Sequence, residues 1–140
     1  MRVSVIVPVY NSEKYIAEAL DSILASDYAD IEVICVDDGS KDASLQILNE
    51  YALRDSRVRV YSQQNSGACV ARNYAISLAK GEFILPVDSD NKITSTFISR
   101  AMAVMLSDTD VKVVAPRAEY FGDKEGEWKL PPFSLNLLAR

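Results

Sequence analysis

The chain has 140 residues, of which 49% are hydrophobic and 25% charged, and its formal net charge is −5. This composition is typical of one folded globular domain, and an acidic chain without a basic cluster is not expected to bind nucleic acid. The absence of histidine excludes a histidine general base, a Ser-His-Asp or Cys-His pair, and histidine metal ligands.

Apolar runs alternate along the chain with amphipathic segments of helical period. This pattern predicts strands at residues 3–7, 31–36, 58–61, 83–87 and 111–115. It predicts helices at residues 13–25, 68–78 and 94–106, with Ser12 and Thr94 as caps, and one more helix that begins after Ser40 or Asp42. Such alternation favours an α/β fold, with a mostly parallel sheet and helices on both of its faces.

Polar residues gather where these strands end. They lie in residues 8–11, in the pair Asp37 and Asp38, in residues 65–67 and in residues 88–90. Because the carboxyl ends of parallel strands meet at one edge of the sheet, these four loops are expected to form a single ligand site.

Two carboxylates, Asp88 and Asp90, follow the fourth predicted strand and are separated only by Ser89. Side chains at i and i+2 of an extended segment point to the same side, so the two acids are expected to face one point. Two like charges about 4 Å apart cost about 1 kcal/mol in water and about 4 kcal/mol at an effective dielectric constant of about 20. A Mg²⁺ or Mn²⁺ ion beside a diphosphate would remove this cost.

The two cysteines do not form a disulfide framework, and Cys35 is expected in the core. No apolar run is long enough to span a bilayer, so we expect a cytoplasmic protein. Residues 116–140 are rich in large apolar side chains without a clear period, and we expect them to pack on a further part of the protein.

Five segments, in this order, resemble the signatures of the family 2 glycosyltransferases. They are residues 5–11 (VIVPVYN), residues 36–42 (VDDGSKD), residues 65–67 with 71–73 (NSG and ARN), residues 81–84 (GEFI) leading into 88–90 (DSD), and residues 128–132 (WKLPP). Several linked signatures over nearly the whole chain are more specific than any one of them.

The resemblance implies a Rossmann-like GT-A fold and metal-dependent, inverting transfer of a sugar from a nucleotide diphosphate, commonly UDP, during glycan or cell-envelope polysaccharide synthesis. It implies a donor-binding core at residues 1–115 and the start of an acceptor-side region at residues 116–140. In this family the acid matching Asp38 contacts the base, and those matching Asp90 and Asp88 hold Mn²⁺ or Mg²⁺. The expected substrate-binding residues are Pro8, Val9, Tyr10, Asn11, Asp37, Asp38, Asn65, Gly67, Arg72, Asp88 and Ser89.

The chain departs from the family pattern at Asn91, where many members have a further acid. The family's catalytic base lies far downstream, so we expect it beyond Arg140 and name no catalytic residue. The alternative function is therefore a donor-binding portion that binds nucleotide without turnover. The resemblance also implies a glycan or lipid-linked acceptor and peripheral membrane association through the C-terminal part.

Two other α/β classes fit less well. A receiver domain would carry its acid pair after the first strand and a lysine after the last, whereas here the pair follows the second predicted strand. A dinucleotide-dependent oxidoreductase would have a G-x-G-x-x-G turn after the first strand, and this chain has none there.

Overall fold

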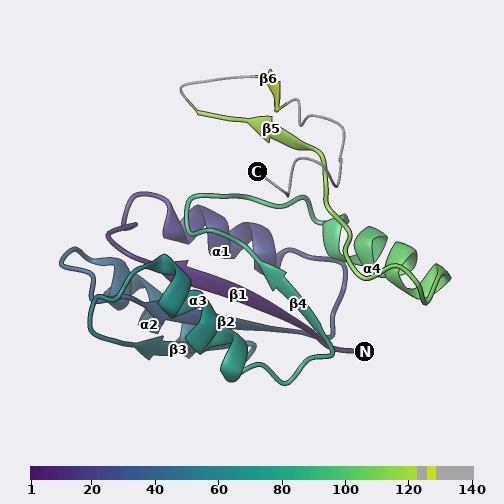
Figure 1. Cartoon of the computed structure of the whole chain (residues 1–140). Helices are drawn as coiled ribbons and strands as arrows, with labels where there is room; N and C mark the ends of the chain where they lie inside the picture. Colours follow the sequence, from purple (N-terminus) through teal and green to yellow (C-terminus); the bar gives the residue numbers. More distant parts are fainter. Residues whose placement is uncertain (123–125, 129–140) are drawn as a thin grey trace, which may run out of the picture. The chain divides into compact units, whose positions relative to one another are not determined.

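The computed structural model of the chain describes residues 1–122 and 126–128 (Figure 1). A parallel sheet contains β1 (Val3–Val9), β2 (Ile31–Asp37), β3 (Val58–Ser62) and β4 (Phe83–Pro86), in the order β3-β2-β1-β4. The helices are α1 (Ile16–Leu24), α2 (Ser44–Arg54), α3 (Ala68–Ser77) and α4 (Phe97–Ser107). The predicted α/β fold with a parallel sheet is confirmed.

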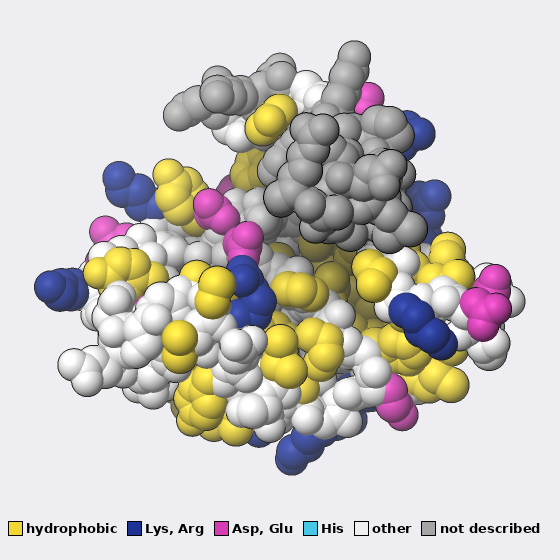
Figure 2. Space-filling model, in the orientation of Figure 1, with side chains coloured by type: hydrophobic (Ala, Val, Ile, Leu, Met, Phe, Trp, Pro, Cys, Tyr) yellow, Lys and Arg dark blue, Asp and Glu magenta, His cyan; other side chains and the backbone are white. Residues whose placement is uncertain are grey.

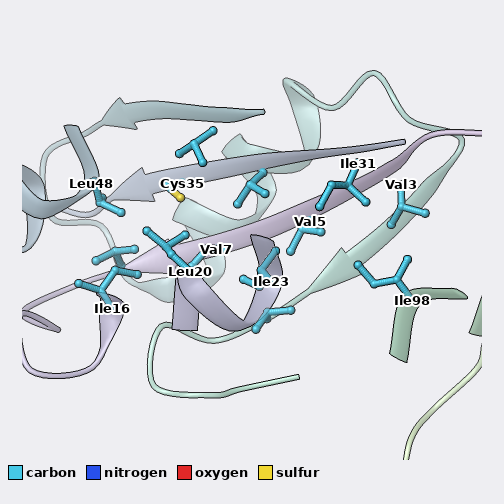
Figure 3. Close-up of a cluster of buried hydrophobic side chains, with 14 of the residues drawn as sticks. Val3, Val5, Val7, Ile16, Leu20, Ile23, Ile31, Cys35, Leu48 and Ile98 are labelled. Atoms are coloured by element: carbon cyan, nitrogen blue, oxygen red, sulfur yellow. The ribbon is translucent and has the colours of Figure 1, made fainter. Parts of the chain in front are cut away.

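The core lies on both faces of β1 and β2, where all seven residues of each strand are buried. On one face, Leu20 of α1, Leu48 of α2 and Ile98 of α4 pack with Val5 and Cys35 of the sheet (Figure 3). On the other face, Ala71 and Ala75 of α3 pack against the sheet. Small residues on α3 allow this helix to lie close to the sheet, and its first turn thereby reaches the ends of the central strands.

The predicted strand at residues 111–115 is wrong, because these residues adopt no regular secondary structure. Val113 is 82% exposed, so the apolar run is not part of a core. A short apolar run forms a strand only where a neighbouring strand can pair with it, and this pairing is not a local property of the sequence.

The next strands are β5 (Ala118–Tyr120) and β6 (Gly126–Trp128), which pair antiparallel. The sequence pattern predicted no element there. The resemblance at residues 129–132 and the apolar side chains up to residue 140 lie outside the described residues.

Backbone contacts divide the chain into two units, Met1–Met102 and Ala103–Arg140. The boundary predicted at residue 115, between a donor-binding core and an acceptor-side region, stays a prediction. None of the helices within residues 1–122 has the length and apolar character needed to cross a bilayer.

Ser12 was predicted to cap a helix with its side chain, and this prediction is wrong. Helix α1 begins at Ile16, and its N-terminal flanking residue Tyr15 makes no side-chain capping bond. The Ser12 carbonyl accepts the amides of Tyr15 and Ile16, whereas the Ser12 hydroxyl turns towards Tyr10 and Ser89.

Candidate functional site

A pocket of about 340 Å³ lies at the carboxyl ends of β1, β2 and β4, beside the start of α3. In open parallel sheets ligands bind where the strand order reverses, and here it reverses at β1, whose neighbours are β2 and β4. The pocket is lined by Pro8, Val9, Tyr10, Asp38, Ala68, Arg72, Asp88, Ser89 and Asp90.

Pro8 explains why the sheet opens at this point. The Ile6 carbonyl accepts the amide of Val87, and the Val9 carbonyl accepts the amide of Asp38. Successive residues of a strand face alternate neighbours, so Pro8 belongs to the row that faces β4. Proline has no N–H to donate, and β1–β4 pairing ends at Ile6 and Pro86, so the two strands separate beyond this point.

Asp38 is buried, with 2% of its surface exposed, and its carboxylate organises the loop before α3. It accepts hydrogen bonds from Gln63 Nε2, the Ser66 amide and the Gly67 amide, each at 2.8 Å. Burial raises the pKa of Asp38, but the three hydrogen bonds together lower it by more than burial raises it. The net pKa therefore lies below its ordinary value. A carboxylate accepts about four hydrogen bonds, so one acceptor position remains.

Arg72 of α3 pairs with the first acid of the loop after β4. Its Nη2 lies 2.8 Å from Asp88 Oδ1, and the side chains are 32% and 54% exposed. This ion pair reduces the repulsion expected between Asp88 and Asp90. The buried Nε of Arg72 has no hydrogen-bond partner among the described residues, so the guanidinium keeps a donor for a further acceptor.

Asp90 is exposed and lines the pocket. Among residues 1–122 and 126–128, no group of three or more His, Cys, Asp or Glu side chains could hold a metal ion. Mg²⁺ is usually held by one or two carboxylates together with substrate phosphates and water, so Asp88 and Asp90 fit such an ion as hard oxygen donors. The two acids lie in a turn closed by the Asn91 amide and the Asp88 carbonyl, not in the extended segment that was predicted.

The family model described as Glycosyl transferase family 2 matches residues 4–138. The chain belongs to glycosyl transferase family 2. The predicted family is therefore confirmed.

Named relatives agree with this membership. The chain is 39% identical over 127 residues to glycosyltransferase GlyG of Streptococcus pneumoniae serotype 4, a match that covers 90% of this chain and 42% of the relative. It is similar to S. aureus TarS 1-349 in complex with UDP-GlcNAc, with a TM-score of 0.72 and 42% identity over 76% of this chain and 32% of that one.

A third match is the mannosyltransferase PcManGT from Pyrobaculum calidifontis in complex with GDP-Man and Mn²⁺. Its TM-score is 0.67 at 29% identity, over 74% of this chain and 32% of that one. These matches confirm the GT-A type of fold. The chain spans less than half the length of each of these three proteins.

Four residues expected at the family 2 site lie outside the pocket lining. Asn65 donates from Nδ2 to the Asp38 carbonyl, and Gly67 donates its amide to the Asp38 carboxylate. Gly67 has φ +93°, and a Cβ there would meet nothing within 4 Å, so glycine serves the backbone conformation rather than a close approach within the chain. Both residues shape the loop that holds Asp38.

Of the other two, Asn11 connects the loop after β1 to the loop after β2, and Asp37 stabilises the loop after β2. Asn11, at φ +49°, donates its amide to Ser40 Oγ and accepts the Lys41 amide on Oδ1. Asp37 is buried, and its Oδ2 accepts the Ser40 amide, while its Oδ1 has no partner among the described residues.

Sequence reasoning missed Ala68, which lines the pocket, and Gln63 and Ser66, which bind Asp38. Ser66 lies within the predicted segment 65–67, and Gln63 and Ala68 lie within two residues of it, so the position of that segment beside the site was the signal that could have found them. The contact of Ser12 with Ser89 was missed as well, because Ser12 resembled an ordinary helix cap.

Proposed function

We propose that this chain binds the nucleotide-diphosphate sugar donor of a metal-dependent glycosyltransferase, with a UDP-sugar as donor and Mn²⁺ or Mg²⁺ as the cation. The observation that carries the proposal is the convergence on one pocket of a buried acceptor, Asp38, and an acidic loop, Asp88 to Asp90. The UDP-GlcNAc and GDP-Man complexes of the similar proteins support a donor of this class.

Asp38 supports recognition of the base. Its remaining acceptor position can take the imide N–H of uracil, and its lowered pKa keeps the carboxylate ionised at neutral pH. The nearby Pro8, Val9 and Tyr10 supply the apolar wall on which a base can lie.

The other end of the pocket suits the diphosphate. A cation held by Asp90 and Asp88 would bind the diphosphate oxygens, and when bound it would stabilise the negative charge that develops on the leaving nucleoside diphosphate. Arg72 holds Asp88 in place, and its position in the pocket lining supports a further contact of the guanidinium with an anionic group.

Calorimetric titration of UDP, with Mn²⁺ or with EDTA, tests this assignment. We expect Asp90→Asn to lower the Mn²⁺-dependent affinity by at least tenfold and to leave binding in EDTA unchanged. Glu50→Gln makes the same change of charge on the exposed surface of α2 and should alter neither. Metal dependence that survives Asp90→Asn unchanged would contradict the metal assignment.

Comparison of UDP with CDP tests the assignment of Asp38. Cytosine presents an acceptor where uracil presents its imide N–H, so CDP would set a lone pair against the carboxylate. An unpaired polar contact of this kind costs about 1–3 kcal/mol, which corresponds to about 5- to 150-fold weaker binding. Equal affinities would show that Asp38 serves only the loop.

The second candidate function is nucleotide binding without turnover. It is favoured by the pocket lining, in which Asp38, Asp88 and Asp90 are the carboxylates and all three have donor-side roles. Release of free sugar from a UDP-sugar, or its transfer to a glycan, by this chain alone would exclude the second candidate.

The family resemblance further supports inverting transfer to a glycan or lipid-linked acceptor in the cytoplasm, with peripheral membrane association through the C-terminal part. Cell fractionation of the longer protein tests this location, since a peripheral protein is released from membranes by high salt.

A further inference from the structure

The acidic loop follows β4, an edge strand of the sheet, and two polar side-chain contacts join residues 88–90 to the rest of the described chain. One is the Arg72–Asp88 ion pair. The other joins Ser89 Oγ to Ser12 Oγ at 2.7 Å, across 77 residues of sequence. Ser12 lies between β1 and α1 and is buried, with 8% of its surface exposed.

The direction of these hydrogen bonds follows from the number of protons. The Ser12 hydroxyl also contacts the Tyr10 carbonyl at 3.2 Å, and a carbonyl only accepts. A hydroxyl has one proton, so with Ser12 as the donor to the Tyr10 carbonyl we assign Ser89 as the donor to Ser12. Ser89, which lines the pocket, then offers only lone pairs to a ligand, so it suits a cation or a sugar hydroxyl and not a phosphate oxygen.

Ser12 is itself held by its backbone, independently of its side chain. Its amide donates to Ser44 Oγ at 2.7 Å, and Ser44 is fully buried at the start of α2. Its carbonyl accepts the amides of Tyr15 and Ile16 at the start of α1. Loss of the Ser12 hydroxyl alone would therefore leave these anchors in place.

We propose that Ser12 is a positioning residue of this site. Its hydroxyl accepts the hydrogen bond of Ser89, fixes the acidic loop against the loop after β1, and turns the Ser89 oxygen to the pocket as an acceptor. The contribution of Ser12 to ligand binding rests on the proposed function of the pocket, whereas its contribution to the order of the loop does not.

Amide hydrogen exchange in the ligand-free chain tests the order of the loop. The Asn91 amide bonds to the Asp88 carbonyl at 3.0 Å, and the Val87 amide bonds to β1 at 2.9 Å. We expect Ser12→Ala to raise the exchange rate of the Asn91 amide about fivefold and that of the Val87 amide less than twofold. An unchanged Asn91 rate, or an equal rise at both amides, would overturn the proposal.

Calorimetry then tests the consequence for binding. We expect Ser12→Ala and Ser89→Ala each to lower the Mn²⁺-dependent affinity for UDP about fivefold, with the affinity for uridine changed less than twofold. The double variant should lose no more than the worse single variant, because the two hydroxyls act as one unit. Ser77→Ala, which removes an exposed hydroxyl with a local bond on α3, is the matched control.

An equal loss of uridine and UDP affinity would indicate general loosening of the fold and would overturn the proposal. Fully additive losses in the double variant would overturn it as well. If the unaltered chain bound no UDP at all, the proposed function would fail, and the exchange experiment alone would decide the role of Ser12.

Discussion

The central strands β1 and β2 and the edge strand β4 present the two ends of the pocket in different ways. All residues of β1 and β2 are buried, and Asp38, one residue beyond β2, is 2% exposed and accepts three hydrogen bonds. Strand β4 has only four residues, alternates between half-buried and exposed, and leads to acids that are exposed.

This difference indicates that the two ends are stabilised by different forces. The end with Asp38 is fixed by the packing of the core, while the end with Asp88 and Asp90 is fixed by a few polar contacts. Among the described residues drawn in Figure 2, Lys and Arg side chains are scattered over the visible face together with acidic ones.

A matched pair of substitutions on one face of the sheet tests this difference most strongly. Ile6 on β1 is 0% exposed and Ile84 on β4 is 40% exposed. Ile6→Ala should cost about 2–5 kcal/mol in the free energy of unfolding, because it leaves a cavity in a packed core. Ile84→Ala should cost less than about 1 kcal/mol, and equal costs in urea unfolding would contradict the comparison.

Asp→Asn changes at the two ends form the second pair. In Asp38→Asn an NH₂ group replaces one acceptor, so a buried donor such as the Gly67 amide loses its partner, at a cost of about 1–3 kcal/mol. Asp88→Asn breaks only a partly exposed ion pair, which is worth about 0–1 kcal/mol. Thermal unfolding of both variants measures the difference, and a larger loss at Asp88 would reverse our interpretation.

Acid should weaken the Asp38 end of the pocket. The folded pKa of Asp38 lies below its ordinary value of 3.8, because its hydrogen bonds outweigh the effect of burial. The stability contributed by the ionised form is therefore complete above the ordinary value and is lost as the pH falls through the lower folded value. Urea unfolding from pH 7 to pH 3 should show a shallower decline for Asp38→Asn than for the unaltered chain.

The smallest effect concerns the two thiols. Burial raises the pKa of Cys35 in β2 to about 12, whereas Cys69 on α3 is exposed. A thiol reagent at pH 8 should modify Cys69 within minutes and Cys35 only after unfolding. Cys69→Ser should abolish the reaction of the folded chain, and a remaining reaction would mean that β2 opens readily.

The sequence was sufficient to predict the parallel sheet, because continuous apolar strands and helical periods are local patterns. It also predicted that Asp38, Asp88 and Asp90 would share one pocket, since loops at the carboxyl ends of parallel strands converge. The strand at 111–115 was predicted wrongly because a strand there would need a neighbouring strand to pair with, and the local pattern contains no information about such a partner.

The polar contacts inside the site were beyond prediction. Arg72 was expected to bind substrate, with no partner inside the chain named for it, and its pairing with Asp88 depends on how α3 lies on the sheet. The Ser12–Ser89 contact links residues 77 positions apart, and no pattern of residue spacing in the sequence predicts it. Contacts of this kind depend on the tertiary fold. From the local sequence alone, Ser12 therefore resembled only a helix cap.

The strand order has a consequence for the time at which the two ends form. Contacts of β1 with β2 join residues 28 apart, such as Ser4 and Glu32, whereas those near β4 join residues 80 apart, such as Arg2 and Glu82. The longer loop costs about 0.9 kcal/mol more to close. Ribosomes synthesise about 5–20 residues per second, so they complete β4 several seconds after β2. During synthesis, Asp38 is therefore present in the chain well before the acidic loop.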